Sequence, residues 1–186
     1  MGSVVVPITL FLLTGMSFGW AKPVPYNPYN LRNQKWGPAF VSLAGPLSNI
    51  VLATVAVVLA RILPVTTAVR HEIFARFAVA LSGQGDFLSR WGAFSDALSG
   101  SVPNVVFGIC FFIVFWNVLL AFFNLLPIPP LDGSKVMYAV FSFREETILW
   151  FERYGLMILI AVLFLFPAPV SAVLDLALGF FFGLMA

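Results

Sequence analysis

Four long stretches without a charged residue limit what this chain can fold into more than any other feature. They cover residues 1–21, 36–60, 97–131 and 154–174. A helix needs about 20 consecutive, mostly apolar residues to cross a lipid bilayer. The chain is also 61% hydrophobic and only 10% charged, whereas soluble domains carry roughly a quarter charged residues. The sequence therefore predicts an all-α membrane protein.

The predicted architecture is a polytopic transmembrane helix bundle with four to five spans, in which residues 1–186 form a single membrane domain. The spans are expected near residues 4–20, 38–63, 102–126 and 148–166. A weaker fifth span, 169–186, contains Asp175, and we expect it to insert only partly. The lipid bilayer is thus an expected partner of this multi-pass chain.

Charge and cysteine content exclude several other classes. The net charge of +2 is scattered along the chain without a basic stripe, so nucleic acid is not an expected partner. The single cysteine, Cys110, excludes an internal disulfide and any cysteine-based metal cluster. An isolated cysteine in an apolar segment packs as a small hydrophobic residue, and we expect that role for Cys110.

An extended loop is predicted between the first two spans, over residues 21–37. Pro23, Pro25 and Pro28 push the residues before them toward extended conformations. Two roles are open for this loop. It lies among the lipid headgroups, or it offers an edge to which an extended peptide adds as a strand.

Residues 64–101 are the most polar part of the chain, and we expect a polar loop that contains a short amphipathic helix there. Arg70 and Arg76 lie away from the apolar positions of this helix. The apolar positions are Ile73, Phe74, Phe77 and Leu81. Such a pattern indicates a helix on the membrane surface.

The second span begins with small and polar residues. Ala44, Gly45 and Ser48 recur with helical spacing, and small residues let another helix approach closely. Asn49 is an amide inside the membrane, where polar residues usually face the bundle interior. Two roles remain open for Asn49: it lines a functional site, or it holds two helices together by a hydrogen bond.

The end of the third long span places a carboxylate beside polar residues. Asn117 and Asn124 are seven residues apart and fall on nearly one helix face. Pro127 ends the helix, and Gly133 permits sharp backbone geometry directly after Asp132. An ionised carboxylate there needs a cation, a metal or a proton. A simple turn at the surface is the alternative.

Three segments resemble the site-2 protease family, the intramembrane zinc metalloproteases of peptidase family M50. FNLLPIPPLDG, at 123–133, is similar to the third motif of that family. SLAGPLSN, at 42–49, and FGWAKPVPYNPYNLR, at 18–32, resemble the second span and the preceding loop of its short bacterial members. Ser134 departs from the pattern, because many relatives repeat glycine there.

The resemblance implies a zinc-dependent peptidase in the inner membrane of a bacterium, with transmembrane proteins as substrates. Asp132 would be the carboxylate ligand of the zinc, in a cavity lined by Asn124, Asn117, Asn49 and Gly133. The loop before the second span would present the substrate as an extended strand. Its substrate-binding residues would be Pro23, Val24, Pro25 and Tyr26.

The family also has an H-E-x-x-H motif, which supplies two histidines as zinc ligands and a glutamate as general base. This motif does not occur in the sequence. His71 is the single histidine, and Ala75 stands where the second should be. We expect His71 to be a solvated residue and not a zinc ligand. A catalytic zinc needs about three protein ligands, so these 186 residues are predicted to be inactive on their own.

Two interpretations account for the missing motif. Either the natural chain begins upstream of Met1 and is here shortened at its N-terminus, or the protein is a non-catalytic relative that binds transmembrane partners on the same scaffold. We expect the first, because the span at 4–20 has no flanking charge and because Asp132 is retained. A small transporter is a weaker alternative, since paired interrupted half-repeats do not occur in the sequence.

Overall fold

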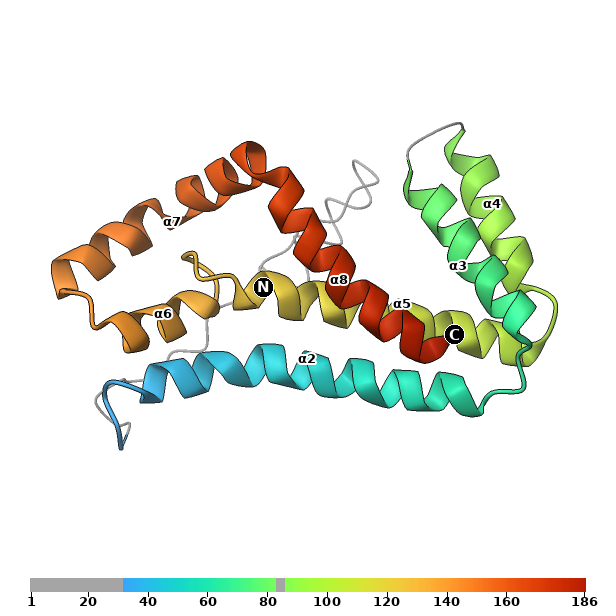
Figure 1. The fold of residues 1–186 in the computed structure, drawn as a ribbon, viewed down its shortest axis with the longest axis horizontal. Coiled ribbons are helices and arrows are strands. Elements are labelled where there is room, and N and C mark those ends of the chain that lie inside the picture. The colour runs from blue at the N-terminus through green and yellow to red at the C-terminus, as the bar shows by residue number, and fades with distance from the viewer. Residues whose placement is uncertain (1–31, 83–85) are drawn as a thin grey trace, which may run out of the picture. The chain divides into compact units, whose positions relative to one another are not determined.

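A computed structural model describes residues 32–82 and 86–186 of the chain (Figure 1). Within these ranges the chain forms seven α-helices and no β-strand, so the all-α prediction is confirmed. The helices are α2 (Gly37–Ile62), α3 (Thr67–Leu81), α4 (Phe87–Leu98), α5 (Val102–Leu125), α6 (Gly133–Phe141), α7 (Glu145–Leu165) and α8 (Pro167–Met185). All seven belong to one compact unit, Lys35–Ala186.

Four of these helices, α2, α5, α7 and α8, are long and apolar enough to cross a membrane. The first two begin and end within one residue of the ranges expected from the sequence, 38–63 and 102–126. Helix α7 begins at Glu145, a little earlier than expected, because Glu145 and Glu146 suit the positive end of a helix dipole. The expected span at 4–20, and all but the end of the expected loop at 21–37, lie outside the described residues.

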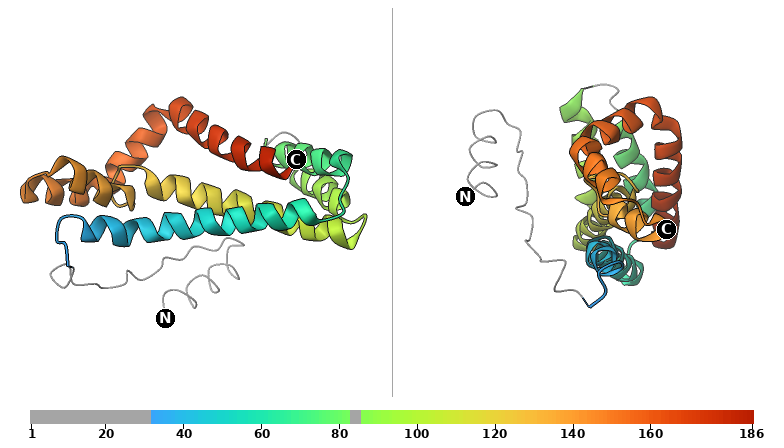
Figure 2. Two further views of the ribbon diagram at one scale, coloured as in Figure 1. Left: turned by 60° about the horizontal axis from the view of Figure 1, so that its bottom comes forward. Right: turned by 90° about the vertical axis from the view of Figure 1, so that its left-hand side faces the viewer.

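Helices α2 and α5 run antiparallel and side by side through the unit (Figures 1 and 2). The buried side of α2 consists of small residues, Ala53, Ala56 and Ala60 among them, and α5 packs Phe107 and Phe111 into the same core. Small side chains let the two backbones approach closely. The contact therefore differs from the expected one, since Ala44, Gly45 and Ser48 are exposed.

The region expected to hold one surface helix instead holds two helices, α3 and α4, packed together at the end of α2 (Figure 1). Protein covers part of the apolar face of α3. Ile73 and Phe77 are buried in the protein core, where the Phe77 ring meets Phe94 and Phe111 at centroid distances of 5.7 and 4.8 Å. Aromatic residues of α4 and α5 thus cover Phe77, whereas Leu81 on the same predicted face is exposed. The location of α3 on a membrane surface stays a prediction.

Arg70 is buried, although the sequence placed it on the polar side of α3. It is 9% exposed, and its guanidinium donates to Val65 O at 3.1 Å, Leu63 O at 3.3 Å and Met185 O at 2.8 Å. Leu63 is the C-cap residue of α2 and Met185 is the last residue of α8. A cation is favourable at both positions because helix C-termini carry unpaired carbonyls and partial negative charge.

Helix α8 lies across α5 and α2 and brings its last turns to this core (Figures 1 and 2). Phe182 stacks on Phe111 at a centroid distance of 4.7 Å and on Phe74 at 5.6 Å. At the opposite end of α5 the chain turns into α6 and then α7. This end carries the segment of interest, residues 126–133.

Candidate metal-ligand site around Asp132

The segment between α5 and α6 is a chain of tight turns. Leu126 N–H donates to Phe123 O at 3.1 Å, Ile128 N–H to Leu126 O at 2.8 Å, and Leu131 N–H to Ile128 O at 3.0 Å. Pro127 has no N–H to continue the helix, so α5 stops before it. These local bonds give the segment a defined path that does not depend on regular secondary structure.

Two glycines hold this segment against its neighbours. A Cβ on Gly133 would lie 2.3 Å from Leu125 O, and a Cβ on Gly155 of α7 would lie 2.5 Å from Pro129 O. Both distances are far below van der Waals contact, so only glycine fits without a shift of the backbone. Residues 126–133 are therefore packed between the end of α5 on one side and α7 on the other.

Asp132 occupies the N-cap position of α6, but its side chain makes no capping hydrogen bond to that helix. Its Oδ2 atom lies 3.5 Å from the position that a Cβ on Gly45 would take, so the carboxylate faces α2. The structure thus brings together the SLAGPLSN and LDG segments, which are far apart in the sequence. The carboxylate of an N-cap aspartate usually accepts a hydrogen bond from a backbone N–H of its own helix. The Asp132 carboxylate makes no such bond, so its oxygens are available to another ligand.

The surroundings of Asp132 shift its titration. It lies outside the four spanning helices, and its partial burial raises the pKa of the carboxyl above the ordinary value. The positive charge of Lys135 acts in the opposite direction. The Lys135 ammonium also pairs with Glu152 of α7, which ties α6 to α7. A cation placed at the carboxylate would favour its ionised form further.

The three asparagines expected around Asp132 lie on the helices beside it. The Asn117 amide donates to Ile113 O at 2.8 Å and the Asn124 amide to Leu120 O at 2.9 Å, each within α5. Asn49 follows Gly45 by one helical turn and so shares the side of α2 that Asp132 meets. Among the described residues, no hydrogen bond links these amides to Asp132. Their role as site-lining residues stays a prediction.

An apolar groove of about 280 Å³ lies next to this site and was not expected from the sequence. Gly133 forms part of its wall together with residues of α2, of the end of α5 and of α6. The other lining residues are Leu43, Leu125, Pro127, Val136, Met137, Val140 and Phe141. The signal was present in α6, where apolar residues recur at 136, 137, 140 and 141, the spacing of one helix face.

The described residues contain one candidate zinc ligand in this segment and not a complete site. Among them, no group of three or more His, Cys, Asp or Glu side chains converges, whereas a catalytic zinc needs three. His71 is exposed on α3, with Nδ1 2.8 Å from Thr67 O. Helix α3 follows Ile62, which lies about 26 Å along α2 from Gly45. His71 therefore cannot share a metal with Asp132.

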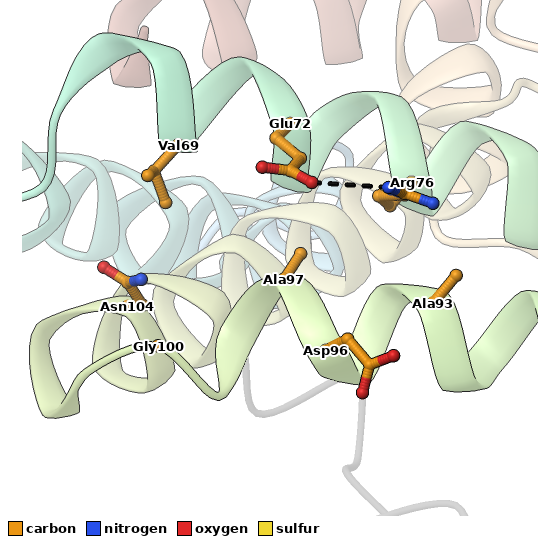
Figure 3. A pocket seen from close by; sticks show the side chains of 8 residues that line it. All are labelled: Val69, Glu72, Arg76, Ala93, Asp96, Ala97, Gly100 and Asn104. Atoms are coloured by element: carbon orange, nitrogen blue, oxygen red, sulfur yellow. Dashed lines mark hydrogen bonds and ion pairs between the residues drawn. The ribbon is translucent and has the colours of Figure 1, made fainter.

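A polar hollow of about 330 Å³ lies between α3, α4 and the start of α5 and offers no convergent set of metal ligands (Figure 3). Glu72 points along α3 and pairs with Arg76 at 3.4 Å. The Asp96 carboxylate, on α4, points away from that pair. The two acidic groups do not converge, so Asp132 remains the candidate ligand. The predicted substrate-binding residues Pro23, Val24, Pro25 and Tyr26 lie outside the described residues.

Comparisons with known proteins give the same family as the motifs. The family model for peptidase family M50 matches residues 25–166. The Bacillus subtilis (strain 168) protein "Putative zinc metalloprotease YwhC" is 30% identical over 131 residues. That match covers 70% of this chain and 47% of the relative, so the chain spans about half the length of the relative it matches. No solved structure matches the chain significantly.

The family assignment agrees with the structure in two respects. The matched region, residues 25–166, includes both Gly45 and Asp132, which the fold brings together. Four helices are suited to cross a bilayer, as an integral membrane protein requires. The chain therefore belongs to peptidase family M50.

Proposed function

We propose that this chain contributes Asp132 as the carboxylate ligand of the zinc centre in a site-2-protease-like metallopeptidase, which cleaves transmembrane proteins in the cell membrane of a bacterium. The observation that carries the proposal is the placement of Asp132. Its carboxylate is uncapped, faces Gly45, and stands on a segment that two glycines hold in place. The family and the name of the Bacillus relative support zinc as the metal.

The chain's own residues have three tasks in this proposal. Gly133 and Gly155 fix the backbone that carries Asp132, so that the carboxylate stays at one position. The apolar groove beside Gly133 accepts side chains of a substrate segment. A transmembrane substrate must unwind locally before cleavage, because a helix hides its carbonyls in hydrogen bonds. Residues 23–26 hold the unwound segment as an extended strand.

The other zinc ligands come from elsewhere in this proposal. The 186 residues contain one histidine, and it lies on α3, far along α2 from Gly45. Two imidazole ligands therefore have to be contributed by a polypeptide segment outside these residues. On their own, the 186 residues are expected to cleave no substrate, and Asp132→Ala is expected to leave that result unchanged. Zinc-dependent cleavage by the 186 residues alone would contradict this expectation.

Zinc binding by the natural protein gives the sharpest test. We expect the protein purified from its native membrane to carry zinc. We expect Asp132→Ala to weaken zinc binding by more than about 100-fold, the upper end of the loss seen when an outer-shell partner is removed. Zinc content is measured by mass spectrometry of the metal, and affinity by competition with a chelator. Asp96→Ala, which removes an exposed carboxylate on α4, is the matched control and should keep the metal.

The intact mass of the same sample distinguishes the two interpretations of the missing motif. A species above 20.4 kDa that contains a His-Glu-x-x-His peptide supports the peptidase. A 20.4 kDa species without zinc, which still binds transmembrane clients, supports the non-catalytic binding protein instead. Zinc retained by Asp132→Ala at unchanged affinity would remove Asp132 from the ligand set.

A further inference from the structure

Helix α8 carries one charged residue, Asp175, near its middle. The helix has 19 residues and is otherwise apolar enough to span a membrane. The Asp175 side chain is exposed, and among the described residues no cation lies within ion-pair distance of it. If α8 spans a bilayer, an ionised carboxylate near its middle is costly unless a partner compensates its charge. Asp175 therefore calls for a partner that the described part of the chain does not supply.

Asp175 lines an apolar groove of about 350 Å³ formed by α3, α5 and α8. Phe77 and Leu81 come from α3, Phe111 and Phe115 from α5, and Gly179 from α8. The groove is therefore hydrophobic with one acidic group. This combination suits a ligand that is apolar along its length and positively charged at one point.

Two glycines extend the same side of α8 from Asp175. Gly179 and Gly183 follow it at intervals of four residues, so all three lie on one face. A Cβ placed on either glycine would meet no atom within 4 Å. Only 6% of the spanning part of α8 is buried, against 39% for α5. We name Asp175, Gly179, Gly183 and the adjoining groove the Asp175 face; it is open and lets another helix approach closely.

We propose that the Asp175 face binds a transmembrane helix of a partner protein that carries a lysine or arginine near the middle of its span. The two glycines admit the partner backbone, and the cation pairs with Asp175. A second copy of this chain fits poorly, because copies inserted in the same direction would oppose Asp175 to Asp175. The chain's own uncharged run, residues 1–21, has no cation to offer.

This site is separate from the candidate metal ligand. Phe115, in the wall of the groove, lies about 15 Å along α5 from Leu125, and Asp132 lies beyond that end. The inference therefore does not rest on the proposed peptidase function. It holds or fails independently of zinc binding.

Model transmembrane peptides in liposomes test this inference with the full chain. Three peptides are identical except for a central lysine, leucine or glutamate, and each carries a dansyl group. Energy transfer from the five tryptophans of the protein reports binding. We expect the lysine peptide to reach half-saturation at an about tenfold lower mole fraction than the leucine peptide, the effect of one interhelical polar contact.

Variants identify the residues responsible. Asp175→Asn should abolish the preference for lysine, and Asp175→Lys should shift it to the glutamate peptide. Gly179→Leu should weaken binding of all three peptides. Gly92→Leu is the matched control, because a Cβ there also meets no atom within 4 Å but Gly92 lies on α4. It should leave binding unchanged.

Three outcomes would overturn the inference. Equal binding of the lysine and leucine peptides removes the role of charge. A lysine preference that persists in Asp175→Asn means that the peptide's lysine binds a group other than Asp175. A dimer of the protein, detected by chemical cross-linking in the liposomes and abolished by Gly179→Leu, without peptide binding, assigns the face to self-association.

Discussion

Gly133→Ala is expected to lower the free energy of unfolding by about 3 kcal/mol or more, the upper range for added volume in a packed interior. The new methyl group would lie 2.3 Å from Leu125 O and 2.5 Å from Leu126 O. Both are backbone atoms, which cannot rotate away as a side chain can. The segment at 126–133 must move instead, and Asp132 moves with it away from Gly45. Denaturant unfolding in detergent, followed by tryptophan fluorescence, measures the loss.

Gly92→Ala provides the matched control for Gly133→Ala. Gly92 lies within α4, and a Cβ there meets no atom within 4 Å. Alanine favours a helix over glycine by about 0.5–1 kcal/mol, so this variant should be as stable as the parent or more so. Equal stability of the Gly133→Ala and Gly92→Ala variants would show that the approach of Gly133 to Leu125 O is not tight in solution.

The sequence was sufficient for the spanning helices because their signal is local. Long uncharged runs predicted the ends of α2 and α5 to within one residue. A run of apolar residues and its flanking prolines can be recognised without knowing what packs against them. The turn at Asp132 was accessible for the same reason. Pro127 and Gly133 determine backbone geometry at their own positions, whatever the tertiary contacts.

Contacts between distant segments could not be read in the same way. The meeting of Asp132 with Gly45 depends on the antiparallel pairing of α2 and α5, which hydropathy does not specify. In the sequence, Gly155 is only an isolated glycine in a helical pattern. The structure shows why a glycine fits there, because Pro129 O lies where a side chain would be. The burial of Ile73 and Phe77 could not be read for the same reason, because the pattern of α3 shows an apolar face but not what covers it.

Arg70→Met is expected to lower the free energy of unfolding by about 4 kcal/mol, since a hydrogen bond from a charged donor contributes about 1.5–3 kcal/mol. Methionine keeps much of the side-chain length but donates nothing. The carbonyls of Leu63 and Met185 would then lose their donor at the ends of α2 and α8. Because Arg70 joins these helix ends, the last turns of α8 should exchange amide hydrogens faster than the rest of the unit. Hydrogen exchange with mass spectrometry measures this local effect.

Arg76→Met is the matched control, since Arg76 lies on the same helix but is exposed and pairs with Glu72 at 3.4 Å. An exposed pair within a helix contributes about 0.3–0.5 kcal/mol, so this variant should unfold nearly as the parent does. Arg70→Lys should fall between the two, because an ammonium is a compact donor that cannot match the planar fork of a guanidinium. If Arg70→Met and Arg76→Met lose the same stability, the guanidinium of Arg70 does not join α2 to α8. If they differ as expected, the buried guanidinium of Arg70 holds the last turns of α8 against the end of α2. The position of Arg70 in the helical pattern of α3 could not reveal this role.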